Sequence, residues 1–309
     1  MLPVSTDSST TRRAVLKLGG WALGSMCWGR SARAAVLSDR GSDSPPNQNL
    51  DRMPKPTPRS ISWGYIGEGG PERWGELDAD YRLCASGQRQ SPIDLTAADF
   101  ESASNSMNST NLENAAGLES FAVLERLEID YHPMPLAVTN TGRTVRFDCV
   151  PGSSLTLGDR RFALKQFHFH CPSEHRFDGV AEAIELHFVH RAETGELAVL
   201  AVLLRAEAGC GDRAEVATLL DNLPPRTGDR IGDPTRTIDP RALLPDRLDR
   251  LYLYNGSLTT PPCSENVSWL ICADPIAIST AQAERFSDAV APNARPLQPR
   301  NRRRLFGSF

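Results

Sequence analysis

Alternation of apolar and polar residues dominates the chain from about residue 136 onward and predicts β-strands. Successive side chains on a strand face opposite sides, so this pattern indicates one buried face and one more polar face. The runs that show it are residues 136–139, 144–149, 161–170, 183–190, 197–205, 251–255 and 267–273. They predict a mainly β fold, a single domain on a large twisted, mostly antiparallel central sheet.

Two stretches carry the 3.6-residue period of an amphipathic helix. The first covers residues 213–223 and places Val216, Leu219, Leu220 and Leu223 on one face. The second follows Ser279, which forms a capping box with Gln282 ahead of an apolar face. Helices are therefore expected to be short and to lie outside the sheet.

The first 34 residues indicate an export signal. Arg12 and Arg13 precede a short apolar stretch, and Ala32-Arg33-Ala34 offers small residues for cleavage after Ala34. This resembles a twin-arginine signal, which predicts a periplasmic or secreted protein. The apolar stretch is too short and too rich in glycine for a permanent membrane span. The alternative interpretation is a disordered basic N-terminus.

Composition divides the rest of the chain in two. Residues 35–60 are rich in Pro and Ser, which predicts a flexible spacer, and residues 61–309 are expected to form the folded domain. The 309 residues carry a formal net charge of −4, which becomes −8 once the five basic and one acidic side chains of residues 1–34 are removed. This charge argues against a nucleic-acid partner, because phosphate binding requires a basic face.

Three histidines fall where two adjacent strands could direct them at one point. His168 and His170 share a strand face with Gln166, and His187 shares a face with Glu185 on the next strand. Three neutral imidazoles leave the fourth tetrahedral position open for water, as in catalytic zinc sites, while Gln166 and Glu185 could orient the rings. A His-x-His pair alone is weak support, since half-buried strands also carry such pairs without metal.

Four segments in one order strengthen the metal interpretation. They read Ser-Gly-Gln-Arg-Gln-Ser-Pro-Ile-Asp-Leu at 86–95, Gln-Phe-His-Phe-His-Cys-Pro-Ser-Glu-His at 166–175, Glu-Leu-His-Phe-Val-His at 185–190 and Ser-Leu-Thr-Thr-Pro-Pro at 257–262. Together they resemble the alpha-class carbonic anhydrases of the exported bacterial type, over residues 63 to 303. The resemblance implies reversible hydration of carbon dioxide to bicarbonate and a proton, in which zinc-bound hydroxide attacks carbon dioxide. The Zn²⁺ ion would be held by His168, His170 and His187.

The same resemblance assigns roles to further residues. Thr259 would orient the hydroxide and donate its own proton to Glu174, and Tyr65 would join the solvent network near the metal. The wall that holds carbon dioxide would consist of Val189, Val199, Leu258, Val267 and Trp269. Sulfonamides and small anions are the inhibitors implied, carbon dioxide and bicarbonate are the partners, and a homodimer is compatible with the sequence.

Six cysteines follow residue 34, and the sequence alone does not pair them. An oxidising compartment permits disulfides, and the resemblance implies a bridge between Cys84 and Cys263. Cys171 comes directly after His170, so strand parity points its side chain away from the metal. Cys149 and Cys272 lie in apolar runs and are expected to be buried as small apolar side chains.

The sequence departs from the family pattern at the residue that would transfer the proton to solvent. Fast members of the family place a histidine at the position of Arg143, but a guanidinium stays protonated and cannot relay a proton. Ser62 also stands where a second histidine often precedes Trp-Gly-Tyr. We therefore expect turnover to be limited by buffer. His132 is a speculative substitute, and a surface histidine is the favoured interpretation of it.

Two other functions compete with this one. A cupin-type metalloprotein would use His168, His170 and Glu174 as ligands, but the glycine expected six residues before His168 is Phe162. A non-catalytic exported zinc-binding protein of the same fold would keep the sheet and lose the chemistry. Such decay should first remove the metal ligands or the hydroxide-orienting pair, and all of them are present.

Overall fold

The computed structural model describes residues 62–96, 100–101 and 122–308. The predicted export signal at 1–34 and the predicted spacer at 35–60 therefore lie outside the described residues. Within the described part of the chain, no helix has both the length and the apolar character needed to cross a membrane.

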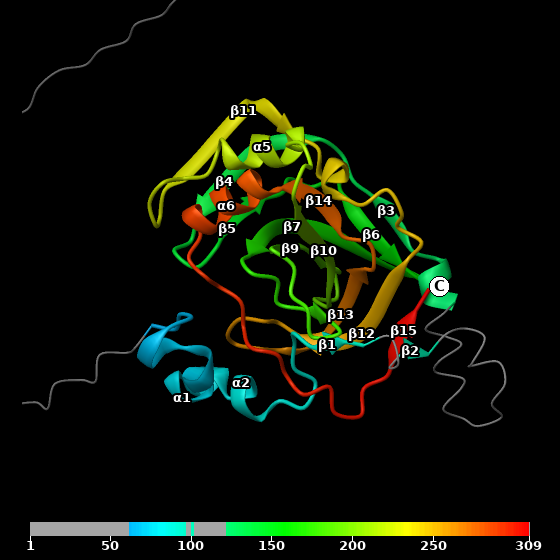
Figure 1. The fold of residues 1–309 in the computed structure, drawn as a ribbon. Coiled ribbons are helices and arrows are strands. Elements are labelled where there is room, and N and C mark those ends of the chain that lie inside the picture. Colours follow the sequence, from blue (N-terminus) through cyan, green and yellow to red (C-terminus); the bar gives the residue numbers. More distant parts are fainter. Residues whose placement is uncertain (1–61, 97–99, 102–121, 309) are drawn as a thin grey trace, which may run out of the picture. The chain divides into compact units, whose positions relative to one another are not determined.

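A 13-stranded sheet forms the body of the described structure (Figure 1). Its main order is β11-β4-β5-β7-β9-β10-β13-β12-β15-β2, with β14 beside β10, β6 beside β7 and β3 beside β6. Most neighbours are antiparallel, whereas β10 runs parallel to β13 and β14, and β15 runs parallel to β2. The predicted fold class, mainly β on a mostly antiparallel sheet, is confirmed.

The strands of this sheet are β2 (Phe100–Glu101), β3 (Glu128–Asp130), β4 (Met134–Asn140), β5 (Val145–Asp148), β6 (Ser154–Leu157), β7 (Arg160–His170), β9 (Ile184–Arg191), β10 (Leu197–Glu207), β11 (Arg230–Ile238), β12 (Leu251–Ser257), β13 (Glu265–Cys272), β14 (Ile276–Ser279) and β15 (Leu305–Gly307). A separate small sheet pairs β1 (Asp94–Leu95) with β8 (Arg176–Phe177). The sequence pattern missed β11, whose burial does not alternate regularly and whose pairing with β4 shifts register.

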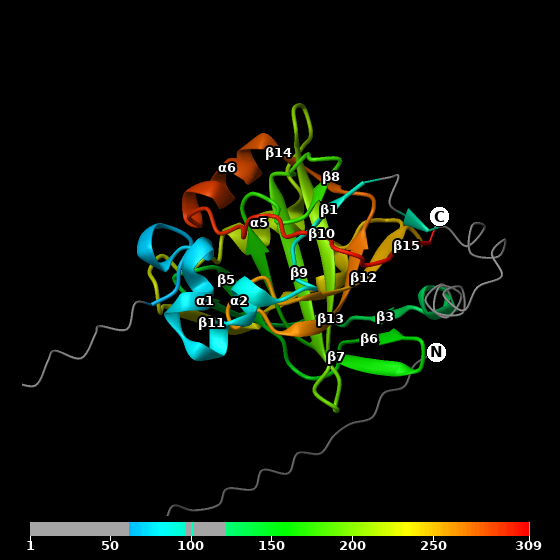
Figure 2. The same cartoon turned by 90° about the horizontal axis from the view of Figure 1, so that it is seen from below.

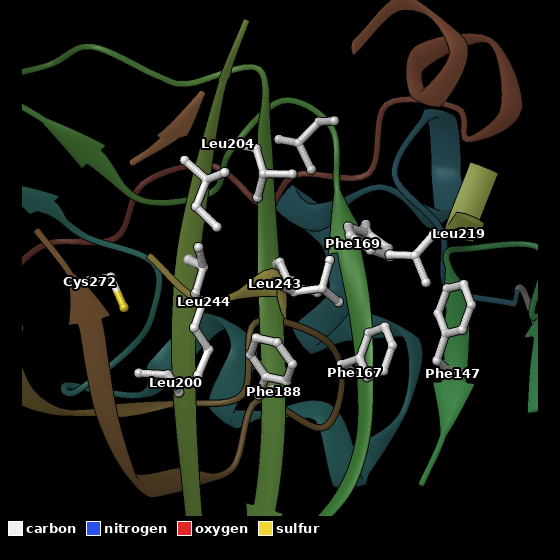
Figure 3. Close-up of a cluster of buried hydrophobic side chains, with 14 of the residues drawn as sticks. Phe147, Phe167, Phe169, Phe188, Leu200, Leu204, Leu219, Leu243, Leu244 and Cys272 are labelled. Atoms are coloured by element: carbon white, nitrogen blue, oxygen red, sulfur yellow. The ribbon is translucent and has the colours of Figure 1, made fainter. Parts of the chain in front are cut away.

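The long central strands β7, β9 and β10 lie side by side (Figure 2). Apolar side chains from one face of these strands form the main core, in which Phe147, Phe167, Phe169 and Phe188 are buried (Figure 3). The rings of Phe147 and Phe167 stack at 4.7 Å between centroids. This packing fixes the rotation of β7, so its alternate residues must face the other side of the sheet.

The two predicted helices are present and shorter than the sequence pattern suggests: α5 covers Ala214–Leu220 and α6 covers Thr280–Ala289. Half of the predicted capping box is wrong. The Ser279 hydroxyl accepts from the Gln282 amide, but the Gln282 side chain bonds both backbone groups of Arg213 instead of returning to Ser279. Gln282 therefore joins the start of α6 to the start of α5.

Short helical turns make up the first described segment. They are the 3₁₀ helices Gly67–Gly69, Pro71–Arg73 and Ala79–Tyr81 and the α-helices α1 (Trp74–Leu77) and α2 (Leu83–Ser86), and a further 3₁₀ helix covers Pro240–Leu243. A disulfide joins Cys84 of α2 to Cys263, which confirms the predicted bridge. The bridge fixes the loop between β12 and β13, which contains Thr259.

Candidate metal centre

Two neighbouring strands bring the three predicted histidines together. His168 and His170 lie on β7, and His187 lies directly opposite His168 on β9. Residues opposite one another in an antiparallel pair point to the same face, and here that face is the one turned away from the phenylalanine core. One ring nitrogen from each histidine lies within 4.8 Å of the others, the spacing at which a single metal ion can bridge them.

Each imidazole is held by a hydrogen bond from the nitrogen that the metal would not use. His168 donates from Nδ1 to Gln166 (2.8 Å), His170 from Nδ1 to the carbonyl of Asn293 (2.8 Å), and His187 from Nε2 to Glu185 (2.7 Å). A neutral imidazole has one donor and one acceptor nitrogen, so the second nitrogen of each ring keeps a free lone pair. Nε2 of His170 is buried with no hydrogen-bond partner in the described structure. These residues fit a three-histidine metal site.

The surroundings keep these rings neutral. Burial lowers the pKa of His168, His170 and His187, and the neighbouring imidazoles lower those values further. Metal ligation requires the neutral form of histidine, so the site meets this condition without an external base.

Glu185 is the hub behind His187. Its carboxylate accepts from His187 and from Nδ1 of His175 (2.6 Å), and from the backbone amides of Glu174 (2.8 Å) and His175 (2.7 Å). Burial alone would raise the pKa of Glu185, but the adjacent His175 and His187 lower it well below its usual value. His175, Glu185 and His187 are also spaced like metal ligands. This network of hydrogen bonds accounts for their spacing.

Glu174 and Thr259 are buried beside the histidines. Oε1 of Glu174 accepts from the amide of Arg295 (2.9 Å), and Oε2 has no partner of normal hydrogen-bond geometry among the described residues. Burial raises the pKa of Glu174 to about 7, while the Arg295 amide and the Thr259 hydroxyl favour its ionised form. Burial raises the pKa of Tyr65, and the charge of Glu174 raises it further.

The predicted apolar wall forms one continuous surface. Val199 on β10 lies opposite Val189 on one side and Trp269 on the other, so the three share a sheet face. Val267 is buried in the same cluster, and Leu258 packs against it. On β9, Val189 is two residues from His187 and therefore faces the same side as the metal ligands.

Other residues weighed from the sequence lie elsewhere. Cys171 is buried in the main core, and its amide bonds to the side chain of Asn293. His190 is buried and bonds to the Tyr131 hydroxyl (2.7 Å) and to the carbonyl of Ala198. His132 is exposed and pairs with Asp130 at 3.0 Å. Among the described residues, none of these three belongs to the histidine cluster.

Arg143 lies at the outer edge of the site, fixed against the first described segment. Its Nε donates to the carbonyl of Trp63 (3.0 Å), one terminal nitrogen donates to Ser62 (2.7 Å), and its guanidinium stacks 4.0 Å from the Trp63 ring centroid. Arg143 and Ser62, where the sequence resemblance predicts relay histidines, therefore bond to one another.

Sequence reasoning missed Asn293. Its carbonyl orients His170, its side-chain oxygen accepts from Cys171, and its side-chain amide donates to Arg143 and Phe169. It lies 123 residues after His170, in a segment without helix or strand, so no periodicity marks it. Only its place within the Asn-Ala-Arg-Pro-Leu-Gln run could have drawn attention to it.

Comparisons with known proteins agree with this geometry. A family model described as eukaryotic-type carbonic anhydrase matches residues 69–309. A carbonic anhydrase of Nostoc sp. is 42% identical over 247 residues, which cover 79% of this chain and 85% of that protein. A carbonic anhydrase of Neisseria gonorrhoeae is 38% identical over 243 residues, 78% of this chain and 86% of that protein.

Solved structures show the same likeness. The alpha-carbonic anhydrase of Thermovibrio ammonificans, in complex with the inhibitor sulfanilamide, matches with a TM-score of 0.69 and 34% identity, covering 79% of this chain and 98% of that one. The cupin alternative is thereby set aside. Since both sequence and fold match over most of its length, the chain belongs to the eukaryotic-type, or alpha-class, carbonic anhydrase family of enzymes.

Proposed function

We propose that this protein catalyses the reversible hydration of carbon dioxide to bicarbonate and a proton with Zn²⁺ held by His168, His170 and His187. The observation that carries the proposal is the convergence of three neutral imidazoles, each with one nitrogen hydrogen-bonded and one free. Neutral nitrogen donors suit Zn²⁺, and three of them leave a position for solvent.

The chain's own residues would orient the reaction. Zinc, when bound, supplies a Lewis acid that lets water ionise near neutral pH, an effect for which carbonic anhydrase is itself the standard example. The Thr259 hydroxyl would accept a hydrogen bond from the nucleophilic oxygen and donate its own proton to Glu174. Ionised Glu174 can only accept, so it fixes the direction of the Thr259 hydroxyl and, through it, the direction of the nucleophile's lone pair.

The apolar wall would hold the substrate. Carbon dioxide is small, linear and without charge, so hydrocarbon side chains retain it without ordering water around polar groups. Val189 and Val199 come from adjacent strands on the face of the metal ligands, which supports this assignment. Ligands with an apolar ring, such as aromatic sulfonamides, are expected to use the same wall.

Arg143 leaves the site without a fixed proton relay at its edge. Its guanidinium is stacked on Trp63 and bonded to Ser62, which holds it at this position. We infer that protons leave through water to dissolved buffer, and that maximal turnover depends on buffer concentration.

Export through the twin-arginine route to the periplasm or beyond is the proposed location. The Cys84–Cys263 disulfide supports it, because such bridges persist in oxidising compartments. Fractionation of cells that express the whole chain tests this: a periplasmic product that begins after residue 34 is expected, and a full-length cytoplasmic product would contradict it.

Stopped-flow hydration of carbon dioxide, on protein assayed for zinc, tests the function. We expect about one zinc per chain, on the basis of a single three-histidine site, and a rate abolished by an aromatic sulfonamide. Protein that is replete with zinc and inert toward carbon dioxide would instead support a non-catalytic zinc-binding protein of the same fold.

A further inference from the structure

A second arginine, Arg146, lies directly beside the proposed metal ligands. It is on β5, where it is the cross-strand partner of His168, and His168 in turn is the partner of His187 on β9. Directly opposed residues share a face and have Cβ atoms about 5 Å apart, so Arg146, His168 and His187 form one row on the metal side of the sheet. Burial and the other two histidines lower the pKa of His168, and the charge of Arg146 lowers it further.

The Arg146 guanidinium is held by its inner nitrogen alone. Nε lies 2.8 Å from Oδ1 of Asp148, two residues along the same strand, and Oδ2 of Asp148 lies 3.2 Å from a terminal nitrogen of Arg230. The side chain of Arg146 is 41% exposed. In the described structure its two terminal nitrogens have no protein partner. The bond from Nε to Asp148 thus positions the guanidinium, while its two terminal nitrogens stay available to a ligand.

Charge on this side of the site is positive. Asp148 is shared between Arg146 and Arg230, so one carboxylate balances two guanidinium groups. Arg143, three residues before Arg146, adds another cation without a carboxylate partner among its contacts. The chain as a whole is acidic, with a net charge of −4, and the facing wall is apolar. A cationic wall next to the metal ligands therefore favours anions that reach the site.

We propose that Arg146 is an anion-binding residue of this site, whose guanidinium binds bicarbonate or another small planar oxyanion beside the metal. The proposal rests on the proposed function for the identity of its ligand, and on the geometry of Arg146 for the site itself. A planar guanidinium offers two parallel N–H donors that match two oxygens of a planar anion, which a lysine ammonium cannot reproduce.

This role has a kinetic consequence. When the association rate is unchanged, tighter binding of bicarbonate means slower release. Arg146 therefore lowers the KM for bicarbonate and strengthens inhibition by planar anions, while uncharged carbon dioxide gains nothing from it.

The test measures binding as well as rate. Calorimetric titration of the zinc-loaded protein with nitrate, a planar anion, and iodide, a spherical one, is compared for the wild type, Arg146→Gln and Arg146→Lys. We expect Arg146→Gln to bind nitrate about tenfold more weakly, as for the loss of a partly exposed charge-assisted pair. Arg146→Lys should keep its affinity for iodide and lose most of the preference for nitrate. The KM for bicarbonate should rise in parallel with the nitrate Kd, because the same guanidinium would bind both anions.

Arg160→Gln is the matched control, because it removes the same charge from an exposed arginine paired with Glu196 at 2.9 Å. Equal nitrate affinity in Arg146→Gln and the wild type would overturn the proposal, as would an equal loss in Arg160→Gln. Zinc-loaded protein that binds nitrate through Arg146 yet fails to hydrate carbon dioxide would refute the proposed function and leave the anion site standing.

Discussion

The inner end of the metal site, which holds the histidines, and its outer edge, which holds Arg143 and Arg146, differ in burial and in hydrogen bonding. At the inner end His170, Glu174, Glu185 and His187 are all buried, and each of the three histidine rings is held by its own hydrogen bond. At the edge Arg143 contacts the exposed Ser62 and the half-buried Trp63, and Arg146 is 41% exposed. The sequence resemblance predicts the roles of the inner residues, whereas it predicts a histidine at the position of Arg143.

Burial explains this difference. A buried polar group that loses its partner costs far more than an exposed one, so a change at the inner end disturbs several bonds at once. Under the proposals made above, the inner end would define the reaction, and the edge would set the rate limit and the response to anions.

Replacement of a ligand should abolish the activity. His187→Ala removes one of the three metal nitrogens and one of the partners of Glu185, so we expect loss of zinc and a fall in hydration rate of at least about 1000-fold. Zinc content and stopped-flow rates measure both. Arg143→Gln, at the edge, should retain zinc fully. If His187→Ala retained its zinc and its hydration rate, the inner end would be no more important for activity than the edge.

Loss of the Thr259 hydroxyl should lower the hydration rate less than loss of a metal ligand does. Thr259→Ala leaves the three histidines in place, so zinc should stay bound while kcat/KM for carbon dioxide falls about 100-fold, in the range for removal of a positioned hydrogen bond. Thr260→Ala, the neighbouring threonine, is the control and should stay near wild-type rate. Equal effects of the two variants would count against a role for Thr259.

Acid should destabilise the strand that carries His187. Burial lowers the pKa of His190, on the same strand, from its usual 6.5 to about 4. The unfolded chain therefore binds a proton more readily than the folded one, so the stabilisation is complete above pH 6.5 and is lost as the pH falls toward 4.

His190→Gln measures this effect. Between pH 7 and pH 5 the free energy of unfolding should fall by about 2 kcal/mol more in the wild type than in the variant, as the shift in the pKa of His190 requires. Urea unfolding at a series of pH values gives both slopes. Identical slopes would show that His190 is not the buried neutral group described here.

A relay histidine at the edge should produce the smallest change in rate. In weak buffer Arg143→His should raise kcat about tenfold, since a group that titrates near neutral pH can pass the proton outward. Imidazole should raise the wild-type rate and have little effect on this variant. Arg143→Gln, which removes the charge without adding a relay, should show no such gain. A wild-type kcat that does not change with buffer concentration would contradict the proposal that buffer limits proton release.

The sequence alone predicted the long strands that carry the site and the faces of their residues. Parity placed Gln166, His168 and His170 on one side of β7 and Glu185 with His187 on one side of β9, because alternation is set by the covalent backbone over a few residues. The same argument turned Cys171 away from the metal. The disulfide between Cys84 and Cys263 required the family resemblance, since spacing does not pair cysteines.

Only the tertiary structure decided what joins distant segments. The bond from Asn293 to His170, the hold of Ser62 and Trp63 on Arg143, and the sharing of Asp148 by Arg146 and Arg230 each link residues far apart in the chain. Such contacts depend on how whole strands and loops pack, and no local period encodes them. The residues of the proposed metal site could therefore be predicted from the sequence, whereas the contacts that hold Arg143 and Arg146 at its edge were found only in the folded structure.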